Sequence, residues 1–111
     1  MSAQAATVTI DQIVASLTRR GFYGGISFDD TQTQVYAVNE ELGEVSRMFR
    51  RSLQGVELID PTRLREEAVD VLIAAVCLAA TACGSRLSDA VAEKLEHDEA
   101  RGWRHNGTQT R

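Results

Sequence analysis

The sequence predicts an all-α fold, a four-helix bundle formed by a single domain, and three observations support this prediction. Four segments repeat apolar residues every three or four positions, which is the spacing of one helix face. Each segment is bounded by residues that favour helix ends, and no useful length of chain alternates apolar and polar residues as a strand does. At 111 residues, 43% of them hydrophobic, the chain suits one domain, but one so small that we expect a homodimer or homotetramer.

The first helix is expected to begin after Thr9. The stretch Thr9–Gln12 has the pattern of a capping box, in which the two end side chains each satisfy a backbone N–H of the first turn. Arg19 and Arg20 suit the negative end of the helix dipole, and Gly21 can end the helix. We therefore expect a flexible N-terminus at 1–8 and a helical domain at 9–101. The apolar face of this helix comprises Ile10, Ile13, Val14 and Leu17.

The second helix is expected to begin at Asp30 or Thr31, with Thr31–Gln34 as another capping box, and to run to about Leu53. Its apolar stripe comprises Val38, Leu42, Val45, Met48 and Phe49. The loop before it has aromatic residues that either close the end of the bundle or form a wall against the base of a ligand. Candidate residues for such a pocket are Phe22, Tyr23, Phe28 and Trp103.

The third helix is expected to begin with Asp60 as N-cap and Pro61 in the first turn, and to end at about Cys83, before Gly84. It has two apolar stripes on nearly opposite sides. The first comprises Leu64, Ala68, Val71, Ala75, Leu78 and Ala82, and the second comprises Val69, Ile73 and Val76. A helix that is apolar on two faces is buried on both, so we expect the second stripe to meet another subunit.

A fourth helix is expected from Ser85 or Ser88 to about Ala100, followed by a basic C-terminal tail at 102–111.

The composition of the chain argues against several classes of partner and location. The net charge of −4 gives no reason to expect a nucleic-acid polymer as partner, and no apolar run is long enough for a membrane span. Cys77 and Cys83 are the only cysteines, and their spacing on one helix predicts reduced thiols in a cytoplasmic protein.

Acidic residues recur within the apolar stripes of the second and third helices. On a helical wheel, Glu41 lies inside the stripe of the second helix and Glu44 lies on its edge, while Glu40 is further out. The third helix repeats this pattern, with Glu67 inside its first stripe and Asp70 on the edge. The two helices are therefore expected to face each other through their acids.

Four converging carboxylates would repel one another, and burying them costs several kcal/mol unless they are paired or bound to metal. No lysine or arginine lies at the same level of these stripes. A hard divalent cation would solve the problem, and Mg²⁺ (or Mn²⁺) prefers such oxygen ligands. The alternative is that each cluster is a solvated helix face. A di-iron site is disfavoured because His97 and His105 lie at or beyond the end of the last helix.

The pattern Glu40-Glu41-x-x-Glu44, then twenty-two residues, then Glu67-x-x-Asp70 resembles the signature of the MazG-like all-α nucleoside triphosphate pyrophosphohydrolases. That superfamily includes dimeric dUTPases and phosphoribosyl-ATP pyrophosphohydrolases. The downstream stretch from Lys94 to Arg101 is similar to the Lys-x-x-x-Asn-x-x-Arg element of the family, and the resemblance spans roughly residues 31–105. It implies a four-helix bundle of this type, in an oligomer.

The resemblance also implies an enzyme that cleaves a (d)NTP between the α and β phosphates. Glu41, Glu44, Glu67 and Asp70 would bind Mg²⁺. Glu40 would help to hold a second metal or orient the attacking water. Two basic residues, Lys94 and Arg101, would meet phosphate oxygens within the subunit or across a subunit interface, or else they are solvated charges near a helix end.

One position departs from the family pattern. Asp98 stands where the family often has Asn, and an ionised acid cannot donate a hydrogen bond. Gly43, inside the first motif, costs helix stability, and a close approach between helices is our hypothesis for it. Two alternatives to the leading function remain open, a phosphoribosyl-ATP pyrophosphohydrolase and a non-catalytic helical module that binds a partner.

Overall fold

The computed structural model describes residues 6–21 and 28–102, and all regular secondary structure in this part of the chain is helical. Four α-helices, α1 (Ile10–Arg19), α2 (Phe28–Leu53), α3 (Pro61–Cys83) and α4 (Leu87–Arg101), follow one another, with a short 3₁₀ turn, η1 (Gly84–Arg86), before the last. The prediction of an all-α fold with four helices is therefore confirmed. The expected flexible N-terminus at 1–8, the aromatic loop at 22–25 and the basic tail at 102–111 lie wholly or largely outside the described residues.

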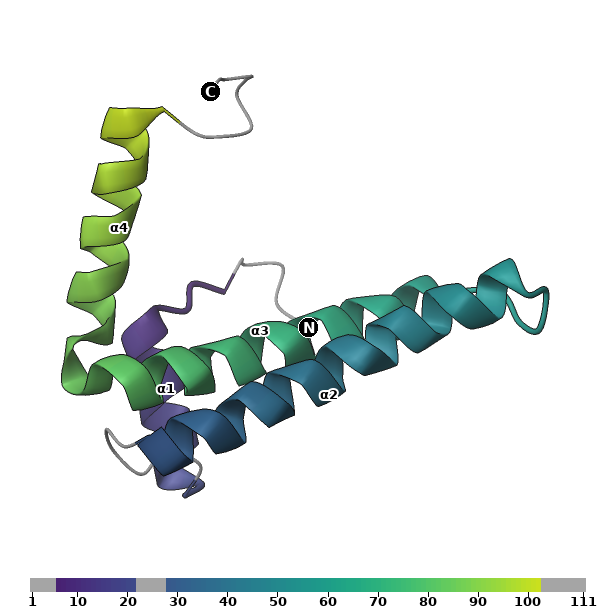
Figure 1. The fold of residues 1–111 in the computed structure, drawn as a ribbon, viewed down its shortest axis with the longest axis horizontal. Coiled ribbons are helices and arrows are strands. Elements are labelled where there is room, and N and C mark those ends of the chain that lie inside the picture. Colours follow the sequence, from purple (N-terminus) through teal and green to yellow (C-terminus); the bar gives the residue numbers. More distant parts are fainter. Residues whose placement is uncertain (1–5, 22–27, 103–111) are drawn as a thin grey trace.

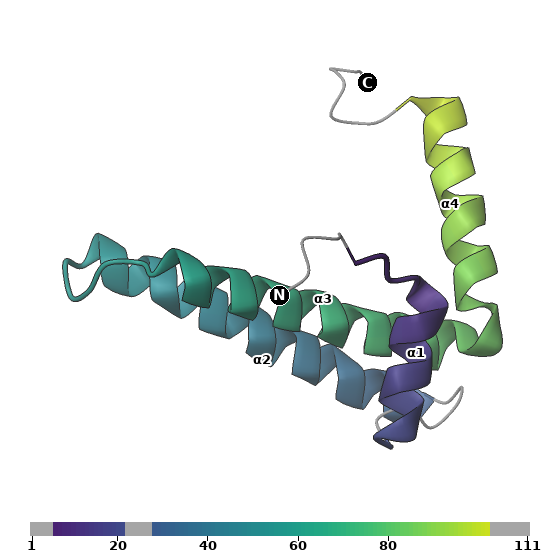
Figure 2. The ribbon, with the colours of Figure 1, turned by 180° about the vertical axis from the view of Figure 1, so that it is seen from behind.

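Helices α2 and α3 form a long antiparallel hairpin, and the two remaining helices lie at one end of it (Figure 1). Helix α1 crosses the C-terminal half of α3, as the reverse view shows (Figure 2). Helix α4 turns away from α3 by 101° and contacts α1 and the end of α3, but not α2. The acid-bearing helices thus face each other, as predicted, while α4 points away from the hairpin.

The helix ends follow the local chemistry that the sequence predicts. Thr9 and Gln12 form the reciprocal capping box, with both backbone-to-side-chain distances at 3.1 Å or less. Asp60 accepts a hydrogen bond from the backbone of Thr62 at 3.0 Å, and Pro61 begins α3. One prediction is wrong: α2 begins at Phe28, so the expected box at Thr31–Gln34 lies inside the helix. Backbone N–H groups inside a helix bond to carbonyls one turn back, so a cap at Thr31 would have no free N–H groups to satisfy.

The hydrophobic core lies where α1, the C-terminal half of α3 and the start of α4 meet. Its buried members are Leu17, Val76, Cys77, Ala80 and Leu87. Ile73 and Val76 belong to the α3 stripe that was expected to meet another subunit, and that prediction is wrong for these two residues. They pack within the same chain because α1 lies across this face of α3.

Both cysteines are free thiols, with Cys77 buried and Cys83 half-buried. Burial raises the pKa of the Cys77 thiol, an effect that the positive charge of Arg20 partly opposes.

Among the described helices, no single one is long and apolar enough to cross a membrane. Helices α3 and α4 reach the required length only together, across the bend between them.

Candidate metal-binding site

Three of the predicted metal ligands meet between the facing surfaces of α2 and α3. Glu41 on α2 and Glu67 and Asp70 on α3 each offer a carboxylate oxygen, and these oxygens lie within 4.8 Å of one another. Helix periodicity explains the meeting, because Glu67 and Asp70 are three residues apart and so share the face of α3 turned toward α2. We call these three residues the acid cluster.

The acid cluster is partly buried and strongly acidic. Glu41 and Glu67 are half-buried, and Asp70 is exposed. Partial burial raises the pKa of Glu41, and the negative charges of Asp70 and Glu67 raise it further, followed by those of Glu40 and Glu44. Within the described chain, no lysine or arginine forms an ion pair with any of the three. The cluster therefore has an unbalanced negative charge at neutral pH.

This donor set fits a hard divalent cation. Mg²⁺ binds oxygen ligands at about 2.1 Å, so two ligands on opposite sides of the ion lie about 4.2 Å apart. A spread of up to 4.8 Å between the three oxygens is close to that value, and small side-chain rotations would close the difference. Three carboxylates leave coordination positions for waters or for substrate phosphates, which is how proteins commonly hold Mg²⁺.

The remaining predicted acids lie around the acid cluster. Glu44, one turn along α2 from Glu41, lies outside the group of converging oxygens and lines the neighbouring pocket toward the end of the hairpin. Glu40 and Glu66 are exposed. Gly43 is exposed as well, and a Cβ placed there would meet nothing within 4 Å. Our hypothesis of a close helix approach at Gly43 is therefore wrong within this chain.

A mainly apolar pocket of about 260 Å³ adjoins the acid cluster on the side of α1. It shares Glu41 and Asp70 with the cluster, and Gln34 adds an amide that can both donate and accept hydrogen bonds. Its other walls are Leu17 of α1, Arg20 at the C-cap of α1, Ala37 of α2, and Ile73, Ala74 and Cys77 of α3. None of the aromatic residues proposed for a ligand pocket is among these described walls. Phe22, Tyr23, Trp103 and the side chain of Phe28 lie outside the described parts of the chain.

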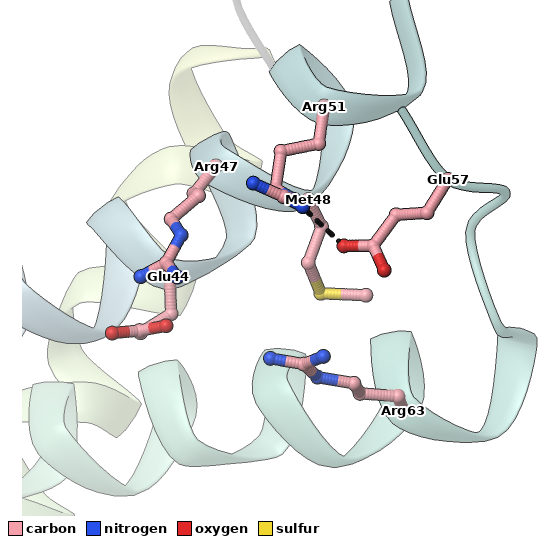
Figure 3. Close-up of a pocket in the computed structure, with 6 residues that line it drawn as sticks. All are labelled: Glu44, Arg47, Met48, Arg51, Glu57 and Arg63. Atoms are coloured by element: carbon pink, nitrogen blue, oxygen red, sulfur yellow. Dashed lines mark hydrogen bonds and ion pairs between the residues drawn. The ribbon is translucent and has the colours of Figure 1, made fainter. Parts of the chain in front are cut away.

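A second, smaller pocket of about 150 Å³ lies on the opposite side of the acid cluster, between α2 and the start of α3 (Figure 3). Three guanidinium groups line it, those of Arg47 and Arg51 from α2 and that of Arg63 from α3. Arg51 donates to Glu57 at 2.8 Å. Buried Met48 and half-buried Glu44 complete the walls. We call this cavity the arginine pocket.

Lys94 and Arg101, the predicted phosphate contacts, do not lie at the acid cluster of their own chain, because α4 does not contact α2 (Figure 1). Both bind Asp98 instead: Lys94 Nζ is 2.6 Å and Arg101 Nη2 is 3.1 Å from Asp98 Oδ1. The hydrogen bond from Lys94, with the positive charges of Lys94 and Arg101, lowers the pKa of Asp98. The residue that departs from the family pattern thus engages both basic residues.

The arginines at the end of α2 were not among the predicted site residues. A signal for the arginine pocket was present in their spacing, since Arg47 and Arg51 follow Glu44 by three and seven residues on one face of α2. Arg63 precedes Glu67 by four residues on the facing side of α3. On the helical wheel that located the acids, Arg51 and Arg63 lie near the edges of their stripes, whereas Arg47 lies further out than Glu40 and could not have been assigned to the pocket in this way.

Comparison with known proteins adds no relative. No protein-family model matches the chain, no curated protein matches its sequence, and no solved structure matches its fold.

Proposed function

We propose that this chain is a Mg²⁺-dependent nucleotide pyrophosphohydrolase, which hydrolyses a (d)NTP to the monophosphate and pyrophosphate. The observation that supports this most directly is the acid cluster: carboxylates from two facing helices converge to within 4.8 Å, with no described basic side chain paired to them. The carboxylates repel one another when no ion is bound, and a divalent cation would remove this repulsion. The resemblance of the acid motif to the all-α pyrophosphohydrolases agrees with this chemistry.

A bound divalent ion would neutralise phosphate charge and lower the pKa of an attacking water. The chain's own acids have separate tasks. Glu41, Glu67 and Asp70 would hold the ion. Glu44, one turn along α2 but outside the converging oxygens, would become a ligand only if its side chain turned toward them. Glu40, exposed beside Glu41, is free to orient the attacking water and accept its proton.

The pocket beside α1 is suited to the nucleoside. Its apolar walls can pack against a base, and Gln34 offers a donor and an acceptor to a base edge. Since Glu41 and Asp70 belong to both the pocket and the acid cluster, a nucleotide bound there has its phosphates beside the carboxylates.

The direct test is pyrophosphate release from a panel of dNTPs, NTPs and phosphoribosyl-ATP in the presence of Mg²⁺ or Mn²⁺. We expect Glu41→Gln to lower kcat/KM by at least about 100-fold, because even residues that only support metal ligands contribute 10- to 100-fold. Glu66→Gln, an exposed acid outside the cluster, is the matched control and should leave the rate unchanged. Turnover of no nucleotide would refute the enzyme, and a preference for phosphoribosyl-ATP would select that alternative.

We further propose that the chain works as a homodimer or homotetramer. Val35, Leu42 and Phe49 recur every seven residues along α2, and their side chains are 39%, 50% and 46% exposed. A row of this kind along a helix is typical of helix–helix packing, and nothing within the described chain covers it. We expect Leu42→Glu to dissociate the oligomer in sedimentation experiments, whereas Leu95→Glu on α4, at 57% exposure, should not.

The second candidate is a non-catalytic module that binds a partner, and the ion pairs of Asp98 favour it. They occupy the two basic residues that the family resemblance assigns to substrate. If Lys94 and Arg101 contact phosphates, Asp98→Asn should lower KM by releasing them from a charged competitor. A chain without turnover that keeps its oligomeric state would support the module.

A further inference from the structure

We propose that the arginine pocket binds the terminal phosphates of the polyphosphate, so that Arg47 and Arg63 do in this chain what was assigned to Lys94 and Arg101. The inference rests on the proposed function for the identity of the ligand, but the pocket itself is argued from its own side chains. The acid cluster lies between this pocket and the pocket beside α1, which we assign to the nucleoside. All three sites lie along the contact between α2 and α3.

The charges of the arginine pocket are not balanced internally. Three guanidinium groups and two carboxylates line it, which leaves one positive charge in a chain whose net charge is −4. Arg51 and Glu57 form an ion pair at 2.8 Å and neutralise each other. Within the described chain, Arg47 and Arg63 form no ion pair. These two residues therefore provide positive charge that an anion can use.

The geometry of the pocket suits an oxyanion. Arg47 reaches the cavity from α2 and Arg63 reaches it from α3, so their guanidinium groups approach the same space from two sides (Figure 3). A guanidinium presents a planar fork of donors that matches phosphate oxygens in pairs. Two forks on different helices can hold one phosphate group from two directions, which a single flexible surface arginine cannot do.

The distance from the acid cluster suits a polyphosphate. Arg63 precedes Glu67 by four residues, a rise of about 6 Å along α3. Arg47 follows Glu41 by six residues, a rise of about 9 Å along α2. The two arginines thus extend from positions one to two helical turns beyond the acid cluster, on the side opposite the pocket beside α1. A nucleotide with its base near α1 would direct its outermost phosphates toward these arginines.

The first experiment measures binding without turnover. Inorganic tripolyphosphate is titrated calorimetrically into the full chain at fixed ionic strength, with a chelator present so that no metal contributes. We expect Arg63→Gln and Arg47→Gln each to weaken binding about tenfold, the loss of one charge-assisted pair of hydrogen bonds. Arg65→Gln, an exposed arginine on the other side of α3, removes the same charge and should change the affinity less than twofold.

A substitution in the acid cluster should change tripolyphosphate affinity in the opposite direction from the arginine substitutions. Without metal, Glu67→Gln removes a negative charge one turn from Arg63 and should strengthen tripolyphosphate binding. Arg63→Lys, which keeps the charge but loses the fork, should fall between wild type and Arg63→Gln. Equal affinities for the Arg63, Arg47 and Arg65 variants would overturn the inference, since they would show a general charge effect. Thermal unfolding of each variant checks that the fold is retained.

These experiments distinguish a failure of the arginine pocket as an anion site from a failure of the proposed enzymatic function. If no nucleotide is hydrolysed but tripolyphosphate binding depends on Arg47 and Arg63, the proposed function fails and the anion site stands. If nucleotides are hydrolysed and Arg63→Gln has the same KM and tripolyphosphate affinity as Arg65→Gln, the enzyme stands and the arginine pocket fails. Both hold if Arg63→Gln raises KM about tenfold while the thermal response to Mg²⁺ alone is unchanged.

Discussion

The two halves of α3 differ in burial and in charge. Its C-terminal half packs against α1 and contains all five of the buried residues of this helix: Ala74, Val76, Cys77, Ala80 and Thr81. Its N-terminal half faces α2 with Arg63, Glu67 and Asp70, and none of its residues is buried. The comparison shows how a small chain accommodates a cluster of like charges. The acids lie where side chains are exposed or only half-buried, while the buried contacts of α3 begin about one turn further along the helix, at Ala74.

The largest effect is expected in the core. Leu17 is 3% exposed and packs against Val76 and Ala80, so Leu17→Ala should lower the free energy of unfolding by about 3 kcal/mol in urea denaturation. Leu58→Ala makes the same chemical change at a side chain that is 92% exposed, near the tip of the hairpin, and should cost less than about 0.5 kcal/mol. Equal costs at the two sites would contradict the assignment of stability to one end of α3.

The second effect is a rise in thermal stability when Mg²⁺ binds the acid cluster between α2 and α3. Mg²⁺ that binds only the folded chain adds about 2.7 kcal/mol to the free energy of unfolding at 100 times its Kd. We expect the Tm of the wild type to rise with Mg²⁺ and that of Glu67→Gln to stay nearly flat. Glu66→Gln, one residue away but exposed and outside the cluster, should respond as the wild type does. A response that is the same in both variants would show that the ion binds elsewhere.

A smaller gain in stability is expected at Gly43, which lies within α2 between the two acids of the motif. Glycine costs about 1 kcal/mol relative to alanine in a helix interior, and a Cβ at this exposed position would meet open space. Gly43→Ala should therefore raise the free energy of unfolding by up to about 1 kcal/mol. If the same variant fails to associate, the glycine serves a contact between subunits that the single chain does not contain.

Sequence patterns predicted the helices well because their ends depend on local chemistry. The capping box at Thr9–Gln12, Pro61 and the glycines act within a few residues of where they stand. The same is true of the periodicity that placed Glu41, Glu67 and Asp70 on facing sides. The start of α2 was missed although the sequence contains a signal for it, because Ser27, a residue type that favours the N-cap position, directly precedes Phe28.

The arrangement of the helices could not be predicted in the same way. Whether Val76 faces α1 or another subunit depends on where α1 lies, and no local pattern specifies that. The same holds for α4: its direction is set at the turn η1, and this turn decides that Lys94 and Arg101 lie away from the hairpin. The arginine pocket was missed for a different reason, since it requires α2 and α3 to be aligned in register before Arg47 and Arg63 meet.

The smallest effect is expected at Asp98, whose carboxylate is largely buried but pairs with the mostly exposed side chains of Lys94 and Arg101. Its pKa is lowered in the folded chain, chiefly by Lys94, so its ionised form stabilises folding above the ordinary aspartate value and this contribution is lost as the pH falls through the lowered value. Asp98→Asn should lower the Tm slightly at pH 7. Lys94 and Arg101 are more than half exposed, so water and salt weaken the attraction.

The pH dependence distinguishes this ion-pair effect from a change in packing. The Tm difference between wild type and Asp98→Asn should shrink as the pH falls below the ordinary aspartate pKa and Asp98 takes up its proton, and it should also shrink in 1 M salt. Glu99→Gln, an exposed acid on the same helix that forms no ion pair with a described residue, provides the control and should show no such difference. A difference that persists unchanged at pH 2 would assign Asp98 a role in packing, and Lys94 and Arg101 would then be free to serve another subunit.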